Sequence, residues 1–234
     1  MNPLEINRGY HGNFVEGIVP GIVSNNKDPD KLGRVKIILP VLGTDHEQQS
    51  SNGKGIETDW APVLSFAAGN NRGGYFIPEV NDEVLVSFLL GDINRPFVVG
   101  VSWNNEDKPP QKNDNGKNDI KQITTRSGNT ILFDDEEGNS KIQIFDKDRK
   151  DEISISAKEN SISIKSDKVI NLTSTNGEVT IKAKKITIEA KDRLNMKASS
   201  ISMKSTGSLS LEGSSVTVKS SGVVSVKGSM VNLN

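Results

Sequence analysis

Residues 177–234 read GEVTIKAKKITIEAKDRLNMKASSISMKSTGSLSLEGSSVTVKSSGVVSVKGSMVNLN. This stretch has no aromatic residue, cysteine, histidine or proline, and its aliphatic side chains come in pairs separated by one residue. On an extended strand, residues two positions apart point to the same face. Each pair therefore predicts a three-residue strand with one apolar side and one polar side. The fold of the chain depends on what these pairs pack against.

The pairs begin upstream of the quoted stretch and recur eleven times, with seven to nine residues between successive first members. Such self-similarity at a fixed period is the signature of a repeat architecture. Gly, Ser, Asn, Lys and Asp fill the intervals, where the chain must turn. The residues that we predict to line a common apolar core are Ile153, Ile155, Ile162, Ile164, Ile170, Leu172, Val179, Ile181, Ile186, Ile188, Leu194, Met196, Ile201, Met203, Leu209, Leu211, Val216, Val218, Val224, Val226, Val231 and Leu233.

One repeat unit cannot fold alone. Burying two aliphatic side chains contributes on the order of 3–6 kcal/mol, whereas ordering eight residues costs roughly 8–16 kcal/mol of backbone entropy. Three arrangements of the region are therefore considered: a disordered Ser/Lys-rich tail, a single-chain β-solenoid with three units per coil, and a triangular prism of three intertwined chains.

The regular spacing argues against a disordered tail, since disorder does not maintain a period. The units resemble one another and lack large side chains, which favours the narrow interior of the prism over the wide interior of a solenoid. We therefore expect residues 153–234 to form an intertwined trimeric triangular β-helix. At about 4.8 Å per repeat, its length is roughly 50 Å.

The rest of the chain also predicts β-structure, so the expected class is all-β. Residues 14–103 hold five short runs of β-forming residues, among them WAPVLSF at 60–66, separated by turn-forming clusters. Five strands at this spacing favour a small closed barrel. Residues 1–13 form a polar N-terminal extension, and 104–119 contain no aliphatic or aromatic side chain and are expected to be a linker. Residues 120–152 predict a connecting hairpin before the repeat.

The composition bounds the function classes. The net charge is −1, and the 29 basic residues divide into 17 before residue 153 and 12 after it, whereas the 30 acidic residues divide into 24 and 6. The front of the chain is thus acidic, which argues against nucleic-acid binding by a barrel. There is no cysteine, no run long enough to span a membrane, and no secretory-signal pattern at the start. The lack of cysteine is compatible with a reducing cytoplasm.

The chemical candidates do not form a catalytic pattern. His11 and His46 lie in polar segments and are read as solvated loop residues. The acidic cluster 134–137 is read as a charged hairpin turn, because a calcium loop spreads its ligands over more positions. The segment GNNRGG at 69–74 lacks the Lys-Ser/Thr of a phosphate loop. The sequence therefore predicts no catalytic residue, no metal site and no cofactor.

Three stretches of the front half carry a family resemblance: DPDKLGRVKIILP (28–40), TDWAPVLSFAAG (58–69) and GGYFIPEVNDEVLVSFLLGDINRPFVVGVSWN (73–104). They resemble the oligonucleotide/oligosaccharide-binding (OB) barrel of the VgrG and phage-baseplate spike family. The segment ITTRSGNTILFDDEEGNSKIQI (123–144) and the repeat after it are similar to the connection of that family into its trimeric β-helix.

The resemblance implies a homotrimeric needle at the tip of a contractile injection machine: a type VI secretion system, a phage tail or a related particle. Such a needle pierces the target membrane mechanically and is not an enzyme. Its implied partners are baseplate hub and tail-tube proteins and a PAAR-repeat protein that caps the tip at Val231 and Leu233. The resemblance also implies that the chain is assembled in the bacterial cytoplasm without a signal peptide and is then delivered in the particle outside the cell or into the target.

Full-length VgrG proteins begin with a large hub domain, whereas here only some 13 residues precede the barrel. The chain is therefore expected to be either a short stand-alone spike or a fragment without its hub. The alternative from another class is a tail-fibre or adhesin stalk that binds a surface polysaccharide. A stalk of that kind needs a receptor-binding head, and the C-terminal residues offer neither exposed aromatics nor paired carboxylates.

Overall fold

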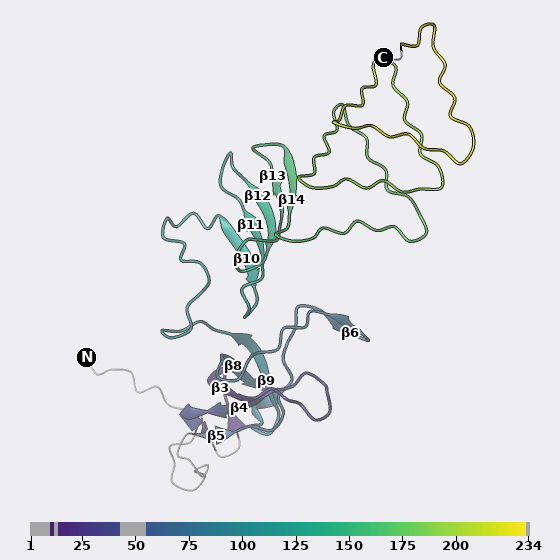
Figure 1. Cartoon of the computed structure of the whole chain (residues 1–234). Helices are drawn as coiled ribbons and strands as arrows, with labels where there is room; N and C mark the ends of the chain where they lie inside the picture. The colour runs from purple at the N-terminus through teal and green to yellow at the C-terminus, as the bar shows by residue number, and fades with distance from the viewer. Residues whose placement is uncertain (1–9, 12–13, 43–54, 233–234) are drawn as a thin grey trace. The chain divides into compact units, whose positions relative to one another are not determined.

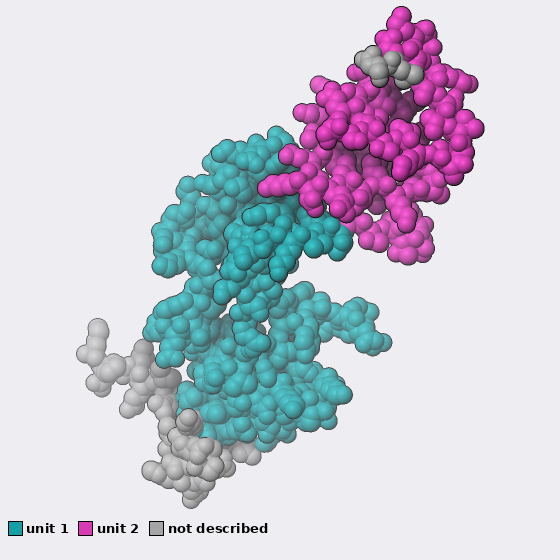
Figure 2. All heavy atoms as spheres, in the orientation of Figure 1, with its two compact units in different colours: residues 1–171 teal, residues 172–234 magenta. Residues whose placement is uncertain are grey.

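The computed structural model describes residues 10–11, 14–42 and 55–232, and its regular structure there is β-strand with two short 3₁₀ turns. This confirms the all-β class. The chain divides into two compact units, Met1–Asn171 and Leu172–Asn234 (Figure 2), which are described separately. Most of the expected N-terminal extension, His46 and Leu233 lie outside the described residues.

The first sheet has five antiparallel strands in the spatial order β5-β4-β3-β8-β9 (Figure 1). These strands are β3 (Val19–Asn25), β4 (Lys36–Leu39), β5 (Ile56–Glu57), β8 (Glu83–Phe88) and β9 (Pro96–Val101). The smaller elements are the pairs β1 (Tyr10–His11) with β2 (Phe14–Val15) and β6 (Ala68–Gly69) with β7 (Arg72–Gly73), and the turns η1 (Pro40–Leu42) and η2 (Leu89–Gly91).

One segment closes this sheet into a barrel. Ala61 and Val35 exchange two backbone hydrogen bonds of 2.8 and 3.0 Å at the β4 edge. Directly after Ala61, the Val98 N–H of β9 donates to the Pro62 carbonyl at 2.9 Å, and the Leu64 N–H donates to the Val98 carbonyl at 3.0 Å. The same segment thus pairs with strands at both edges. The run at 60–66 was expected to be a full strand; it forms these bridges, and β5 precedes it.

Alternating side chains fill the barrel interior. Along β8 the residues alternate between partly exposed and buried, because successive side chains on a strand point to opposite faces. The Ile37 side chain packs so close to position 21 of β3 that a Cβ there would overlap it, which explains the glycine at this position. The core is aliphatic, and its least exposed members are Val23, Val35, Ile37, Leu39, Ala61, Val84, Val86 and Val98.

The turn between β3 and β4 is built around the Asp28 carboxylate, whose side chain is only 3% exposed. Its oxygens accept hydrogen bonds from the backbone N–H groups of Asp30, Leu32 and Arg34 at 3.1, 2.9 and 3.3 Å. The Arg34 guanidinium donates two further bonds to it, at 3.0 and 2.7 Å. The guanidinium, aided by these backbone donors, holds the pKa of Asp28 far below its ordinary value of 3.8.

The second sheet is an antiparallel meander of five strands in sequence order. Its strands are β10 (Ile120–Thr124), β11 (Thr130–Asp134), β12 (Lys141–Phe145), β13 (Glu152–Ser156) and β14 (Ser161–Lys165). The expected hairpin ended at residue 152, whereas the meander continues to residue 165. The first two apolar pairs of the repeat therefore lie in a sheet that the chain forms with itself.

Beyond residue 165 the described chain contains no strand, and it runs as extended segments joined by bends (Figure 1). Every apolar pair from Ile170 to Val226 lies between two bends. The bends recur at 167–168, 175–177, 184, 191–192, 199, 206–207, 214, 221–222 and 229.

From the bend at 175–177 onward, bends of two or three residues alternate with bends of one residue. The structural unit is accordingly a pair of consecutive runs. The first apolar residues of successive units are Val179, Leu194, Leu209 and Val224, so each unit is fifteen residues long. The alternating seven- and eight-residue spacings in the sequence are the signal of this double unit.

We predict that Asp28→Asn destabilises the barrel at neutral pH. A carboxylate whose pKa is depressed in the folded state stabilises that state above its unfolded pKa, and this stabilisation is lost as the pH falls toward the folded pKa. The gap in melting temperature between the wild type and Asp28→Asn should therefore narrow from pH 4 to pH 2. The fluorescence of Trp60 and Trp103 reports the transition, because both tryptophans lie within residues 14–103.

Asp114→Asn, in the exposed linker, is the matched control and should melt like the wild type. Equal melting temperatures of Asp28→Asn and the wild type at pH 7 would show that the Asp28 carboxylate does not stabilise the barrel.

Candidate assembly interface

The apolar pairs of the second unit are uncovered in the single chain. Across the described members from Ile170 to Val231, the exposed fraction of each residue lies between 48% and 73%. A single exposed pair of aliphatic residues is ordinary on a protein surface, but a long series of exposed pairs is not. These side chains are candidate binding residues, and the predicted core residue Leu233 lies outside the described part.

The backbone of the same runs is also unpaired within the chain. Between residues 166 and 232 of the described chain, no backbone N–H donates to a backbone carbonyl. From residue 169 onward, the hydrogen bonds that involve the backbone are local turn contacts of two serines. Ser205 Oγ accepts from the Gly207 N–H at 3.2 Å and donates to the Ser208 carbonyl at 3.0 Å, and Ser220 Oγ accepts from the Gly222 N–H at 3.0 Å.

These two properties require the same kind of partner. Burying the aliphatic pairs removes water from the neighbouring backbone, and buried N–H and carbonyl groups must then find hydrogen-bond partners. Extended strands laid along both edges of each run satisfy both demands together. The site is therefore suited to bind β-strands along its described length.

A charged residue directly follows the second apolar residue in seven consecutive runs. These residues are Lys182, Glu189, Lys197, Lys204, Glu212, Lys219 and Lys227. Each glutamate has a lysine at the equivalent position of the run before it and of the run after it. The two glutamates are three runs apart, which is one full coil if each run forms one side of a triangle.

The remaining predicted core residues lie in the meander. Ile153 and Ile155 of β13 pair directly with Ile164 and Ile162 of β14, so all four point to one face of the sheet. Sequence reasoning did not include the upstream residues of that face. Their signal was present, because the runs TILF and KIQIF carry the same i, i+2 apolar pattern. The omitted residues are Ile123, Ile131, Phe133, Ile142 and Ile144.

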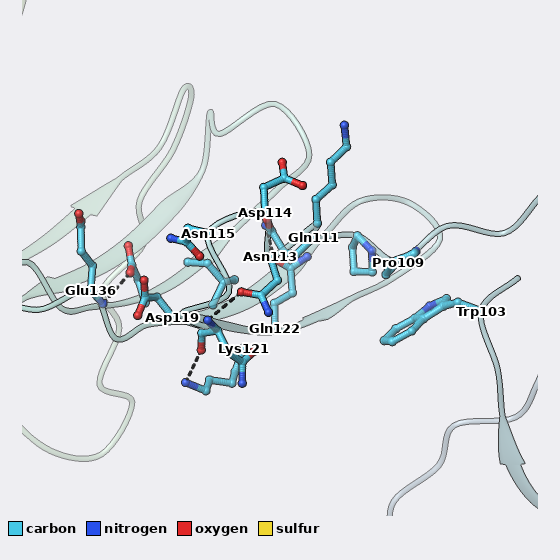
Figure 3. A pocket seen from close by; sticks show the side chains of 15 residues that line it. Trp103, Pro109, Gln111, Asn113, Asp114, Asn115, Asp119, Lys121, Gln122 and Glu136 are labelled. Carbon is cyan, nitrogen blue, oxygen red and sulfur yellow. Dashed lines mark hydrogen bonds between the residues drawn. The ribbon is translucent and has the colours of Figure 1, made fainter. Parts of the chain in front are cut away.

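A hollow of about 1020 Å³ lies between the linker and β10, with Trp103 at one side (Figure 3). Its lining is mostly polar: Lys121 Nζ donates to Asp135 at 2.6 Å and to the Asn118 carbonyl at 2.9 Å. Gln111 and Gln122 are joined by a 2.9 Å hydrogen bond between their side chains. These contacts tie the linker to the sheet and present no nucleophile beside a base.

The chemical candidates of the sequence are scattered. The backbone of His11 lies in β1, whereas His46 is outside the described residues. Within the acidic cluster, the Glu136 N–H donates to Asp134 at 3.0 Å, so these residues close the β11–β12 turn. The segment 69–74 spans the β6–β7 hairpin. Among the residues described, no three His, Cys, Asp or Glu side chains are grouped so as to hold a metal ion.

The described part of the chain also contains no helix with the length and hydropathy of a membrane-spanning segment.

Two protein families match the chain. Residues 19–103 match the family described as the type VI secretion system/phage-baseplate injector OB domain. Residues 148–234 match DUF2345, described as an uncharacterized protein conserved in bacteria. The first match confirms the OB barrel that the sequence predicts, and the two together cover both the barrel and the repeat.

Three relatives come from Pseudomonas aeruginosa and Vibrio cholerae. The type VI secretion system spike protein VgrG1b of P. aeruginosa is 34% identical over 108 residues, which are 46% of this chain and 13% of that protein. The actin cross-linking toxin VgrG1 of V. cholerae is 30% identical over 119 residues, or 49% of this chain and 10% of that protein. The spike protein VgrG3 of V. cholerae is 32% identical over 117 residues, or 48% and 11%. The chain thus spans only a small part of the length of these relatives.

We predict that Ile188→Asp abolishes association through the repeat, because a carboxylate placed in an apolar interface is costly unless it is paired. The measurement is the solution mass and the melting temperature of the full chain. Thr187→Asp is the matched control, since Thr187 points to the opposite face of the same run. Association and melting unchanged by Ile188→Asp would show that this face is not an interface.

Proposed function

This chain belongs to the VgrG and phage-baseplate spike family, and from that premise we propose that it is a structural spike component that acts as a homotrimer. Its repeat, residues 153–234, forms the needle, and its barrel, residues 14–103, forms a collar that joins the needle to the baseplate. The proposed role is mechanical: the needle pierces the target membrane when the machine contracts.

The observation that carries this proposal is the repeat itself. Its runs expose aliphatic pairs on one side and leave the backbone without intrachain partners over 166–232 of the described residues. Two further copies of the same chain supply strands with matching length, spacing and apolar pairs. In a triangular prism, each copy would provide every third strand on each face, so that every run after residue 165 lies between runs of the other two copies.

Such a prism suits a piercing role for physical reasons. Backbone hydrogen bonds across every strand edge leave no open edge along the faces, and the narrow aliphatic interior leaves little room for rearrangement. Three chains that cross-pair along their length also unfold only together. Stiffness and resistance to unfolding are the properties that a needle requires.

The partners follow from the same role. We propose that the barrel contacts baseplate hub or tail-tube proteins and that a PAAR-repeat protein covers the tip formed by Val231 and Leu233. The chain is proposed to assemble in the bacterial cytoplasm and to leave it with the particle. No role in nucleic-acid binding or catalysis is proposed.

The experiment that tests the proposed function first is the solution mass of the purified full chain by light scattering. We expect a mass near three times 25.4 kDa. Removing residues 104–234, which leaves the barrel alone, should give a monomer, because the barrel closes on its own strands. A full-length chain that remains monomeric at micromolar concentration would refute the trimeric needle.

A second prediction concerns the charged residues that follow the apolar pairs. In the intertwined prism, Glu212 of one chain lies between Lys204 and Lys219 of the other two chains, about 4.8 Å from each strand. Glu212→Lys replaces two attractive contacts per chain by repulsive ones. We expect the melting temperature to fall by a few degrees at low salt and to recover toward wild type in high salt, which screens exposed charges.

Glu106→Lys is the control, because it makes the same change of net charge in the exposed linker, away from the repeat. Equal effects of Glu106→Lys and Glu212→Lys would show that only net charge matters and would contradict the proposed contacts between Glu212 and the two lysines.

A further inference from the structure

The meander β10–β14 has one face made of two aliphatic rows. In the first row, five isoleucines from five strands are direct cross-strand partners: Ile123, Ile131, Ile144, Ile153 and Ile164. The second row, two residues away on each strand, consists of Lys121, Phe133, Ile142, Ile155 and Ile162. Nine of these ten side chains are therefore apolar.

The opposite face is different in character. Its central row is Gln122, Leu132, Gln143, Ser154 and Ser163, which pair in the same way. On the aliphatic face, the nine apolar residues are 41–73% exposed in the single chain. A contiguous apolar surface of this kind marks an interaction site, because monomeric proteins rarely leave one open.

The meander also differs from the segment that follows it, residues 166–232, which we call the coil. Every strand of the meander is paired within the chain, the three inner strands on both sides and the edge strands β10 and β14 on one side. The coil after residue 165 has no such pairing among the described residues. A single chain can therefore form the meander first, whereas the coil can form only when other strands are already beside it.

We propose that the aliphatic face of β10–β14 binds the same face of two further copies, and that this contact forms first and aligns the three chains for the coil. The inference rests on the proposed trimer and names the surface that starts it. The partner of this face is another copy of the chain, because the face leads in sequence directly into the repeat. Ile162 and Ile164 are the last members of the two rows, and the next apolar pair along the chain is Ile170 and Leu172.

Alignment is a real demand on this chain. The apolar pairs of the coil are alike, so a chain displaced by one or two runs relative to its neighbours still buries aliphatic side chains against aliphatic side chains. Weakly specified register of this kind leads to slipped pairings. Three meanders packed face to face align the three chains with one another before the coil forms. A displacement of one chain by one or two runs is then excluded, because each coil is covalently joined to its aligned meander.

The position of the one charged side chain on this face is compatible with packing of the face against other copies. Lys121, the one polar member of the two rows, lies in the edge strand β10, and its ammonium group is bound by Asp135 at 2.6 Å. The interior of the two rows carries no charge. Three copies of the face can thus meet around a threefold axis without burying an unpaired charge.

Cross-linking tests the contact directly, because the chain has no cysteine of its own. In the full-length protein, Ile144→Cys places one thiol on the aliphatic face, and Ser163→Cys places one on the opposite face. Under mild oxidation, Ile144→Cys should give more than tenfold as much disulfide-linked dimer as Ser163→Cys. Equal or no cross-linking of Ile144→Cys in a trimeric sample would overturn the proposal and leave the proposed function standing.

Assembly kinetics test the order of events. After dilution from denaturant, full-length Ile144→Asp should form trimer at least tenfold more slowly than wild type, whereas Ser163→Asp should differ by less than twofold. Ile144→Thr, which keeps a β-branched side chain, should fall between them and guards against simple misfolding of the sheet. An Ile144→Asp chain that assembles at the wild-type rate would refute the proposal, whereas a monomeric wild type would refute the trimer itself.

Discussion

Backbone hydrogen bonding is the constraint on which the rest of this structure depends. An extended run of three residues with two aliphatic side chains buries too little to stay ordered alone, and its N–H and carbonyl groups need partners once water is removed. In the described coil those partners are absent from the chain itself. In the proposed trimer the neighbouring chains supply these partners, so that assembly and folding of the repeat would be one process.

The front of the chain solves the same problem internally. Its sheet closes because the segment at 61–64 pairs with β4 at one edge and β9 at the other, so that the aliphatic interior is covered by the chain's own strands. Under the proposed function, the two parts would therefore depend differently on protein concentration: the barrel closes on its own strands, whereas the repeat would need neighbouring chains.

The sequence predicts the extended runs well because spacing alone determines which side chains share a face. It does not predict where pairing within the chain stops, since the pair Ile153/Ile155 looks the same as the pair Ile186/Ile188. That difference lies in the turns. The Asp146 carboxylate accepts hydrogen bonds from the Lys150 and Asp151 N–H groups at 2.7 and 2.9 Å and so closes a hairpin. The bends after residue 165 lack a comparable closure and leave the chain running onward.

The central claim is that the hydrogen bonds of the coil are made between chains, and amide hydrogen exchange of the full-length protein tests it most directly. The single chain offers the amides of 172–232 only local turn contacts, so any lasting protection there must come from neighbouring chains. The account predicts that the amides within the apolar runs exchange orders of magnitude more slowly than those of the linker 104–119. Exchange of both segments at the rate of an unstructured peptide, in a folded sample at micromolar concentration, would contradict it.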